Sequence, residues 1–68
     1  MIRITFKYKN EQDYVFDENM KIIDVLQTLN FPSDCNIYSK RLRKNVCIHN
    51  TFFEENIYMY DKLELIYE

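Results

Sequence analysis

The stretch DENMKIIDVLQTLNFP, residues 17–32, contains the strongest helical pattern in the chain. Its aliphatic side chains recur at spacings of three and four, which places them on one stripe of a helix. Polar residues that suit a helix N-terminus precede this stripe, and Asn30 followed by Pro32 predicts its end, because proline disfavours helix at the residue before it. The sequence therefore predicts one amphipathic helix with a buried stripe of Ile22, Val25, Leu26 and Leu29.

The segment before this helix has the period-two alternation of half-buried strands. Residues 2–8, IRITFKY, alternate apolar and polar side chains, and a second short run at residues 14–16 follows the polar stretch KNEQD. Two such runs so close together predict an antiparallel hairpin. Asn10 is the residue of the connection that best suits a left-handed conformation.

The segment after the helix predicts three more strands around a compact loop. We expect a strand at residues 37–38, a basic bend, and a short strand at 46–48. Phe52 and Ile57 should then point inward from the loop. The last strand should place Leu63 and Leu65 inward and Glu64 and Ile66 outward.

Composition favours a single folded domain over residues 1–68. Of the 68 residues, 47% are apolar and 16% are aromatic, and the net charge is −2, unlike the profile of a disordered chain. Glycine is absent, so turns that need a positive φ are expected to use the seven asparagines or aspartate. No apolar run is long enough for a membrane span, and the N-terminus lacks the pattern of a signal peptide.

The sequence offers little support for a metal site, a cofactor or catalysis. Two cysteines are too few for a disulfide framework, so Cys35 and Cys47 are expected to be reduced. Cys47 and His49 supply only half of a metal site, without the paired spacing of zinc ligands. A Cys-His nucleophile would also need an orienting group and a cleft that so small a domain rarely encloses. We therefore expect a protein that is not an enzyme.

Several segments together resemble ubiquitin. The segment QDYVFDENMKIIDVLQTL is similar to the second strand and helix of ubiquitin, FPSD to the step that leaves that helix, and TFFEENIYMYDKLELIY to its loop and last strand. This resemblance covers nearly the whole chain. It implies an α+β fold, a ubiquitin-like β-grasp with a four- to five-stranded mixed sheet and one helix packed across it.

Within ubiquitin-like families, the start MIRI and the stretch ENIYMYDKLELIYE resemble the Hub family, also called ubiquitin-like protein five. Ile66-Tyr67 stands where that family has a tyrosine pair. The resemblance implies a nuclear or cytoplasmic adaptor of mRNA splicing that docks a helical motif of a spliceosomal protein without conjugation. The family's acidic residue that pairs with an arginine of the motif aligns near Met20, and the nearest acidic residues are Asp17, Glu18 and Asp24.

Three other interpretations stay open at this point. Ubiquitin-type modifiers and sulfur carriers of the ThiS and MoaD kind need a Gly-Gly terminus, so a carrier role would require that this tail be missing. A secretion accessory protein of the YukD kind also lacks the glycine tail. A structural subunit of a large ribonucleoprotein, such as a ribosome, would suit the basic bend and the tyrosines.

Three surface features are candidates for partner binding. Tyr38 and Ile66 are expected on the sheet face opposite the helix, rimmed by Arg41, as a docking surface for a helical protein partner. Residues 58–60, Tyr-Met-Tyr, form a second candidate patch, or simply pack the loop. The segment SKRLRKN carries a basic patch that can contact RNA or phosphate, or is a solvated turn, formed by Lys40, Arg41, Arg43 and Lys44.

Overall fold

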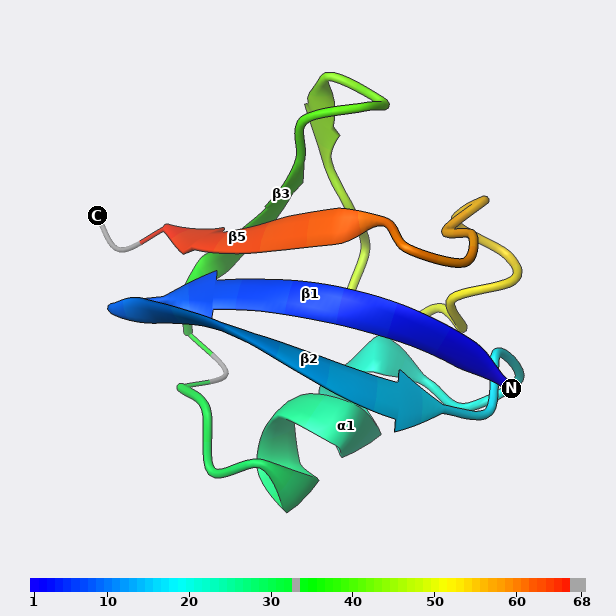
Figure 1. The fold of residues 1–68 in the computed structure, drawn as a ribbon, viewed down its shortest axis with the longest axis horizontal. Helices are drawn as coiled ribbons and strands as arrows, with labels where there is room; N and C mark the ends of the chain where they lie inside the picture. The colour runs from blue at the N-terminus through cyan, green and yellow to red at the C-terminus, as the bar shows by residue number, and fades with distance from the viewer. Residues whose placement is uncertain (33, 67–68) are drawn as a thin grey trace.

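The structure, a computed structural model, describes residues 1–32 and 34–66. It contains one helix and five strands in the order strand, strand, helix, strand, strand, strand (Figure 1). Their bounds are β1 (Ile2–Tyr8), β2 (Asn10–Phe16), α1 (Ile22–Thr28), β3 (Asn36–Ser39), β4 (Lys44–Asn45) and β5 (Lys62–Ile66).

The five strands form one mixed sheet in the order β2-β1-β5-β3-β4. The central pair, β1 and β5, is parallel, and the other neighbours are antiparallel. Parallel strands need a long crossover between them, and the chain from β2 to β4 supplies it, with α1 lying across one face of the sheet (Figure 1). This arrangement confirms the expected α+β fold of the β-grasp type.

The first hairpin is tighter than the sequence predicts. Strands β1 and β2 pair along their whole length, from Ile2 opposite Phe16 to Tyr8 opposite Asn10. The pairing leaves a single residue at the tip, so Lys9, with φ 65°, makes the reversal. The prediction that Asn10 adopts the left-handed conformation is therefore wrong, because Asn10 is already the first residue of β2.

Lysine, arginine and tyrosine share the positive-φ positions with asparagine. The expectation that only Asn or Asp would serve is wrong, because long-range pairing rather than local preference fixes some of these turns. Tyr60, for example, donates its backbone N–H to the carbonyl of Arg3 at 2.7 Å. Among the described residues, positive φ occurs at Lys9, Asn30, Arg43, Asn56 and Tyr60.

The helix ends as predicted but begins differently. At its end, Asn30 has φ 60°, and the N–H of Phe31 bonds the carbonyl of Leu26 at 2.8 Å, as in a Schellman motif. At its start, the N-cap Lys21 makes no side-chain capping bond. The orphan N–H groups of residues 22 and 23 instead donate to the carbonyls of residues 50 and 48, at 3.0 and 2.8 Å. The polar residues 17–19 therefore do not cap the helix.

The fourth strand is displaced from its predicted position. It comprises Lys44–Asn45 instead of residues 46–48. Val46 is buried beyond its end, with its N–H on the carbonyl of Ile37 at 2.8 Å, and Ile48 lies in the turn that caps α1. No described helix has the length and apolar character needed to cross a membrane.

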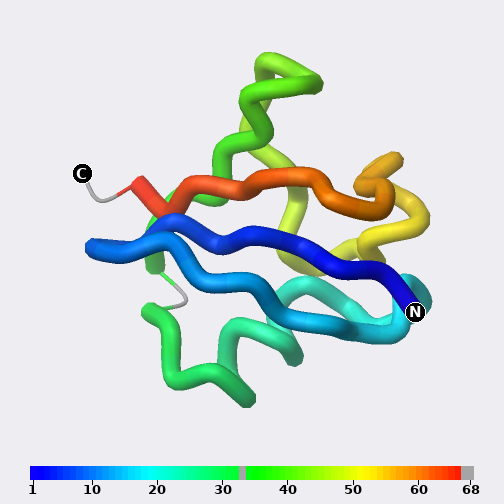
Figure 2. The backbone as a smooth tube through the Cα atoms, in the orientation of Figure 1, coloured from blue at the N-terminus to red at the C-terminus, as the bar shows by residue number. Residues whose placement is uncertain are grey.

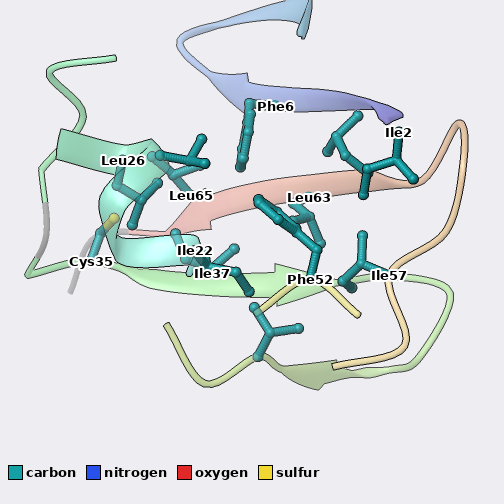
Figure 3. Close-up of a cluster of buried hydrophobic side chains, with 13 residues drawn as sticks. Ile2, Phe6, Ile22, Leu26, Cys35, Ile37, Phe52, Ile57, Leu63 and Leu65 are labelled. Atoms are coloured by element: carbon teal, nitrogen blue, oxygen red, sulfur yellow. The ribbon is translucent and has the colours of Figure 1, made fainter. Parts of the chain in front are cut away.

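Every element of the fold except β2 and β4 contributes side chains to one hydrophobic core (Figure 3). The predicted inward positions are confirmed for Phe52 and Ile57 of the loop and for Leu63 and Leu65 of β5. Leu29, the C-cap residue of α1, is half-buried against this core. The core consists of Ile2, Ile4, Phe6, Ile22, Val25, Leu26, Cys35, Ile37, Val46, Phe52, Ile57, Leu63 and Leu65.

An aromatic cluster closes the core between β2 and the end of α1. The ring of Phe6 lies 5.6 Å from that of Phe31 and 6.0 Å from that of Tyr14, between ring centroids. The rings are tilted or edge-on, an arrangement that favours aromatic pairs beyond the area they bury. Phe31 follows the left-handed Asn30 directly, so the helix terminus positions this ring over the sheet.

Candidate functional site

The candidate functional features of this fold are surfaces. Within residues 1–32 and 34–66 there is no pocket, and no three His, Cys, Asp or Glu side chains gather as metal ligands would. Cys35, which is buried, and Cys47, which is exposed, are both free thiols. Large apolar side chains are exposed mainly on the N-terminus, residues 17–20 and residues 51–60. The backbone of these segments meets at one end of the molecule (Figure 2).

An acidic and apolar surface lies at this end. The N–H of Phe53 bonds the carbonyl of Glu18 at 2.9 Å, and the amino group of Met1 lies 2.8 Å from the Glu18 carboxylate. These contacts bring together segments that are far apart in the sequence, with Phe53 69% exposed. We define the acidic-apolar surface as Met1, Asp17, Met20 and Phe53.

The acidic residues predicted for partner binding differ in how much of their charge is available. Glu18 is compensated by the amino group of Met1, and a hydrogen bond from that group lowers the pKa of the Glu18 carboxyl. The Asp17 carboxylate accepts the N–H of Asn19 and is exposed, and no ion pair engages it among residues 1–32 and 34–66. Asp24 lies in the first turn of α1, also exposed. Asp17 and Asp24 are therefore better placed than Glu18 to meet a cation.

The predicted sheet-face surface is only partly present. Tyr38 and Ile66 lie on the face opposite α1, because their strand neighbours Ile37 and Leu65 are buried on the other side. Tyr38 is half-buried and pairs in register with Glu64, and Ile66 is 38% exposed. Tyr67, which follows Ile66 at the place of the Hub family's tyrosine pair, lies outside the described residues.

The side chain of Arg41 is engaged at the end of β5 away from Ile66. Its guanidinium makes two hydrogen bonds to the Asp61 carboxylate, at 2.8 and 2.7 Å, and lies 4.8 Å from the ring centroid of Tyr58. Asp61 immediately precedes β5, and Ile66 ends it. Five residues of strand separate the two by about 16 Å, so Arg41 serves the opposite end of β5.

Asp61 is the anchor of the loop before β5. Its residue is 8% exposed, and its carboxylate also accepts the N–H of Tyr58 at 2.8 Å. Burial acts to raise the pKa of Asp61, but the hydrogen bonds from Arg41 and from the Tyr58 N–H outweigh it, so that the pKa is lowered overall. The buried Glu55 plays a similar part for the preceding turn, where it accepts the N–H of Cys47 at 2.7 Å.

The predicted basic patch is a turn in which one of four charges is compensated. Residues 40–43 form the turn between β3 and β4, and Lys44 begins β4. Arg41 points to Asp61, whereas no ion pair involves the other three within the described part of the chain. We define the basic turn as Lys40, Arg41, Arg43 and Lys44.

The second predicted patch, residues 58–60, is exposed. Tyr58 is 58% exposed, Met59 47% and Tyr60 76%, so these side chains do not simply pack the loop. The sulfur of Met59 accepts the N–H of Arg3 at 3.1 Å. Sequence reasoning missed the contact between Tyr58 and the basic turn, since no local spacing relates them.

Phe53 was also missed as a surface residue. Phe52 and Phe53 lie in a turn, where no regular alternation indicates which of two neighbouring side chains faces outward. Comparison of the chain with models of known protein families and with curated proteins gives no match. The strand order and core described above carry the fold assignment.

Proposed function

We propose that this protein is a non-enzymatic, ubiquitin-like adaptor that docks a helical segment of a partner protein without covalent conjugation. The observation that carries the proposal is the acidic-apolar surface, in which exposed Met20 and Phe53 lie beside Asp17. Exposed aromatic and methionine side chains are typical of protein-binding surfaces. Carboxylates beside them select a partner with basic residues.

The partner that fits this surface is an amphipathic helix with apolar residues on one face and an arginine or lysine beside them. Its apolar residues would cover Phe53 and Met20, and its cation would reach Asp17 or Asp24. Helices commonly bind to grooves and patches in this way, through side chains spaced by three and four. The interaction should weaken as salt is added, because both carboxylates are exposed.

The resemblance to the Hub family makes the proposal more specific. It suggests that the partner belongs to an RNA-processing, spliceosomal assembly in the nucleus or cytoplasm. In that family the acidic contact precedes the helix, the position where Asp17, Glu18 and Met20 stand in this chain. Because Glu18 is engaged by the amino group of Met1, we assign the ionic contact to Asp17 and Asp24.

The test is an NMR titration of the isotope-labelled protein with the helical peptide motif of that family. Amide signals of residues 17–24 and 53 should shift. Phe53→Ser should weaken binding about tenfold, as for an interface anchor residue, and Asp24→Asn should reduce the salt dependence. The matched control is Val15→Ser, because the Val15 side chain is 54% exposed and lies on the face of β2 that points away from the core.

Two results would contradict the proposal. If no amide signal shifts at saturating peptide, the protein is not an adaptor for this class of partner. If the shifts are confined to Tyr38 and Ile66 and the Phe53→Ser variant binds normally, the partner binds the sheet face opposite α1 instead.

A further inference from the structure

We propose that the basic turn and the exposed Tyr58 and Tyr60 together form a binding surface for single-stranded nucleic acid. Surfaces of this kind combine cations that follow the phosphates with aromatic rings on which bases stack. The sequence separates the two components, since the run SKRLRKN contains no aromatic residue. The fold joins them, because Arg41 of the turn lies over the Tyr58 ring at 4.8 Å.

The contact between the turn and the tyrosine loop is well anchored. Arg41 bonds both oxygens of Asp61, and its Nη2 also donates to the carbonyl of Asn56 at 2.5 Å. The Asp61 carboxylate holds the N–H of Tyr58 in addition. The ring and the turn are thus fixed relative to one another before any ligand arrives, which lowers the cost of ordering them on binding.

The charges available to phosphates are those of Lys40, Arg43 and Lys44. All three are exposed, and no ion pair engages them among the described residues. The pKa of Glu55 is lowered mainly by the hydrogen bonds that its carboxylate accepts from the N–H of Cys47 and the side-chain amide of Asn50, and the positive charge of Lys44 contributes less. The small negative net charge of the chain therefore conceals a locally positive turn.

Tyr60 provides a second, independent argument that this surface binds a single strand. It is 76% exposed and held at φ 69°, a backbone conformation that disfavours a large side chain. Asparagine would suit the turn better, and an exposed ring contributes little to the core. Strain of this kind points to a functional use of the side chain, and base stacking is a use that an exposed ring can serve.

The chemistry favours a single strand over a duplex or an acidic peptide. Bases in a duplex are stacked on each other and cannot reach a protein ring, whereas unstacked bases can. An acidic peptide would satisfy the cations but would leave Tyr60 without a role. This surface involves none of the residues of the acidic-apolar surface, so the inference does not depend on the proposed adaptor function.

The test measures fluorescence anisotropy of labelled oligonucleotides of about ten nucleotides, within the range one small domain covers, with the full 68-residue chain. Single-stranded RNA and DNA should bind at low salt, and their relative affinities identify the preferred sugar. Tyr60→Asn and Tyr58→Ala should each weaken binding about tenfold. The triple substitution Lys40→Gln, Arg43→Gln, Lys44→Gln should lower the slope of log affinity against log salt by about 2.

The controls separate this surface from general attraction and from unfolding. Tyr60→Asn relieves the positive-φ strain, so lost binding in this variant cannot come from a weakened fold. Phe53→Ser removes an exposed ring elsewhere and should leave oligonucleotide binding unchanged. The inference is overturned if a duplex binds as tightly as the single strand, if the tyrosine variants bind normally, or if a glutamate-rich peptide binds more tightly than the oligonucleotide.

Discussion

Replacing Asp61 with alanine should loosen the loop that leads into β5. The carboxylate, in a residue 8% exposed, receives three hydrogen bonds of 2.7–2.8 Å, two from Arg41 and one from the N–H of Tyr58. Alanine would leave the Tyr58 N–H without this partner and release the Arg41 side chain from the loop. The backbone bond from the N–H of Thr5 to the carbonyl of Asp61 would remain possible.

The expected cost follows from these contacts. A hydrogen bond to a charged group contributes roughly 1.5–3 kcal/mol, but removing the carboxylate also removes the cost of burying it. Because the Arg41 side chain is 44% exposed, its bonds to Asp61 are screened by water and count for less. We expect Asp61→Ala to lower the free energy of unfolding by about 2 kcal/mol, which corresponds to about 8–16 °C in Tm for a domain of this size.

Thermal and urea unfolding followed by circular dichroism at neutral pH would measure this change. Glu11→Ala is the matched control, because its ion pair with Lys62 joins two side chains that are about half exposed. It should shift Tm far less than Asp61→Ala. Asp61→Asn keeps an acceptor for the Tyr58 N–H and should fall between the two. Equal shifts for Asp61→Ala and Glu11→Ala would refute the anchoring role.

Three further outcomes follow from the same structure. The pKa values of Asp61 and Glu55 are lowered from 3.8 and 4.5. Their contribution to stability is therefore complete above those ordinary values and lost as the pH falls through the lower folded values. Urea midpoints should thus drop on acidification below about pH 4, and a flat profile would contradict this. Tyr60→Asn should raise the free energy of unfolding by about 0.5–1 kcal/mol through relief of the positive φ, as chemical denaturation would show. A disulfide reagent should label Cys47 in the native protein, whereas Cys35, whose pKa is raised by burial, should react only as the chain unfolds; equal native labelling rates would be inconsistent with the core position of Cys35.

The two proposed surfaces depend on different contacts within the fold. The acidic-apolar surface depends on the bond from Phe53 to the carbonyl of Glu18, and the nucleic-acid surface depends on Arg41 and Tyr58. A variant at Phe53 and one at Tyr60 therefore test different functions on one domain. If both surfaces bind, the protein could join a helical protein segment to a single strand.

Local spacing in the sequence determined which residues are buried. Periodicity indicates which side of a strand or helix faces the core. Examples are the alternation in residues 2–8 and 62–66 and the helical stripe of Ile22, Val25 and Leu26. Those patterns predicted the helix, most of the strands and most of the core, whereas the β-grasp arrangement was predicted from the resemblance to ubiquitin. Turn details were less predictable, since Lys9 and Tyr60 adopt positive φ for reasons of strand pairing and loop docking.

Only the tertiary structure decided which surface residues act together. Arg41 and Asp61 are 20 positions apart, and nothing in their local sequence indicates that one binds the other or that Tyr58 joins them. Likewise, the first N–H groups of the helix donate to the carbonyls of residues 48 and 50 and not to the polar residues that precede the helix. Periodicity encodes the direction of a side chain relative to its own element, whereas contacts between elements depend on the path of the whole chain.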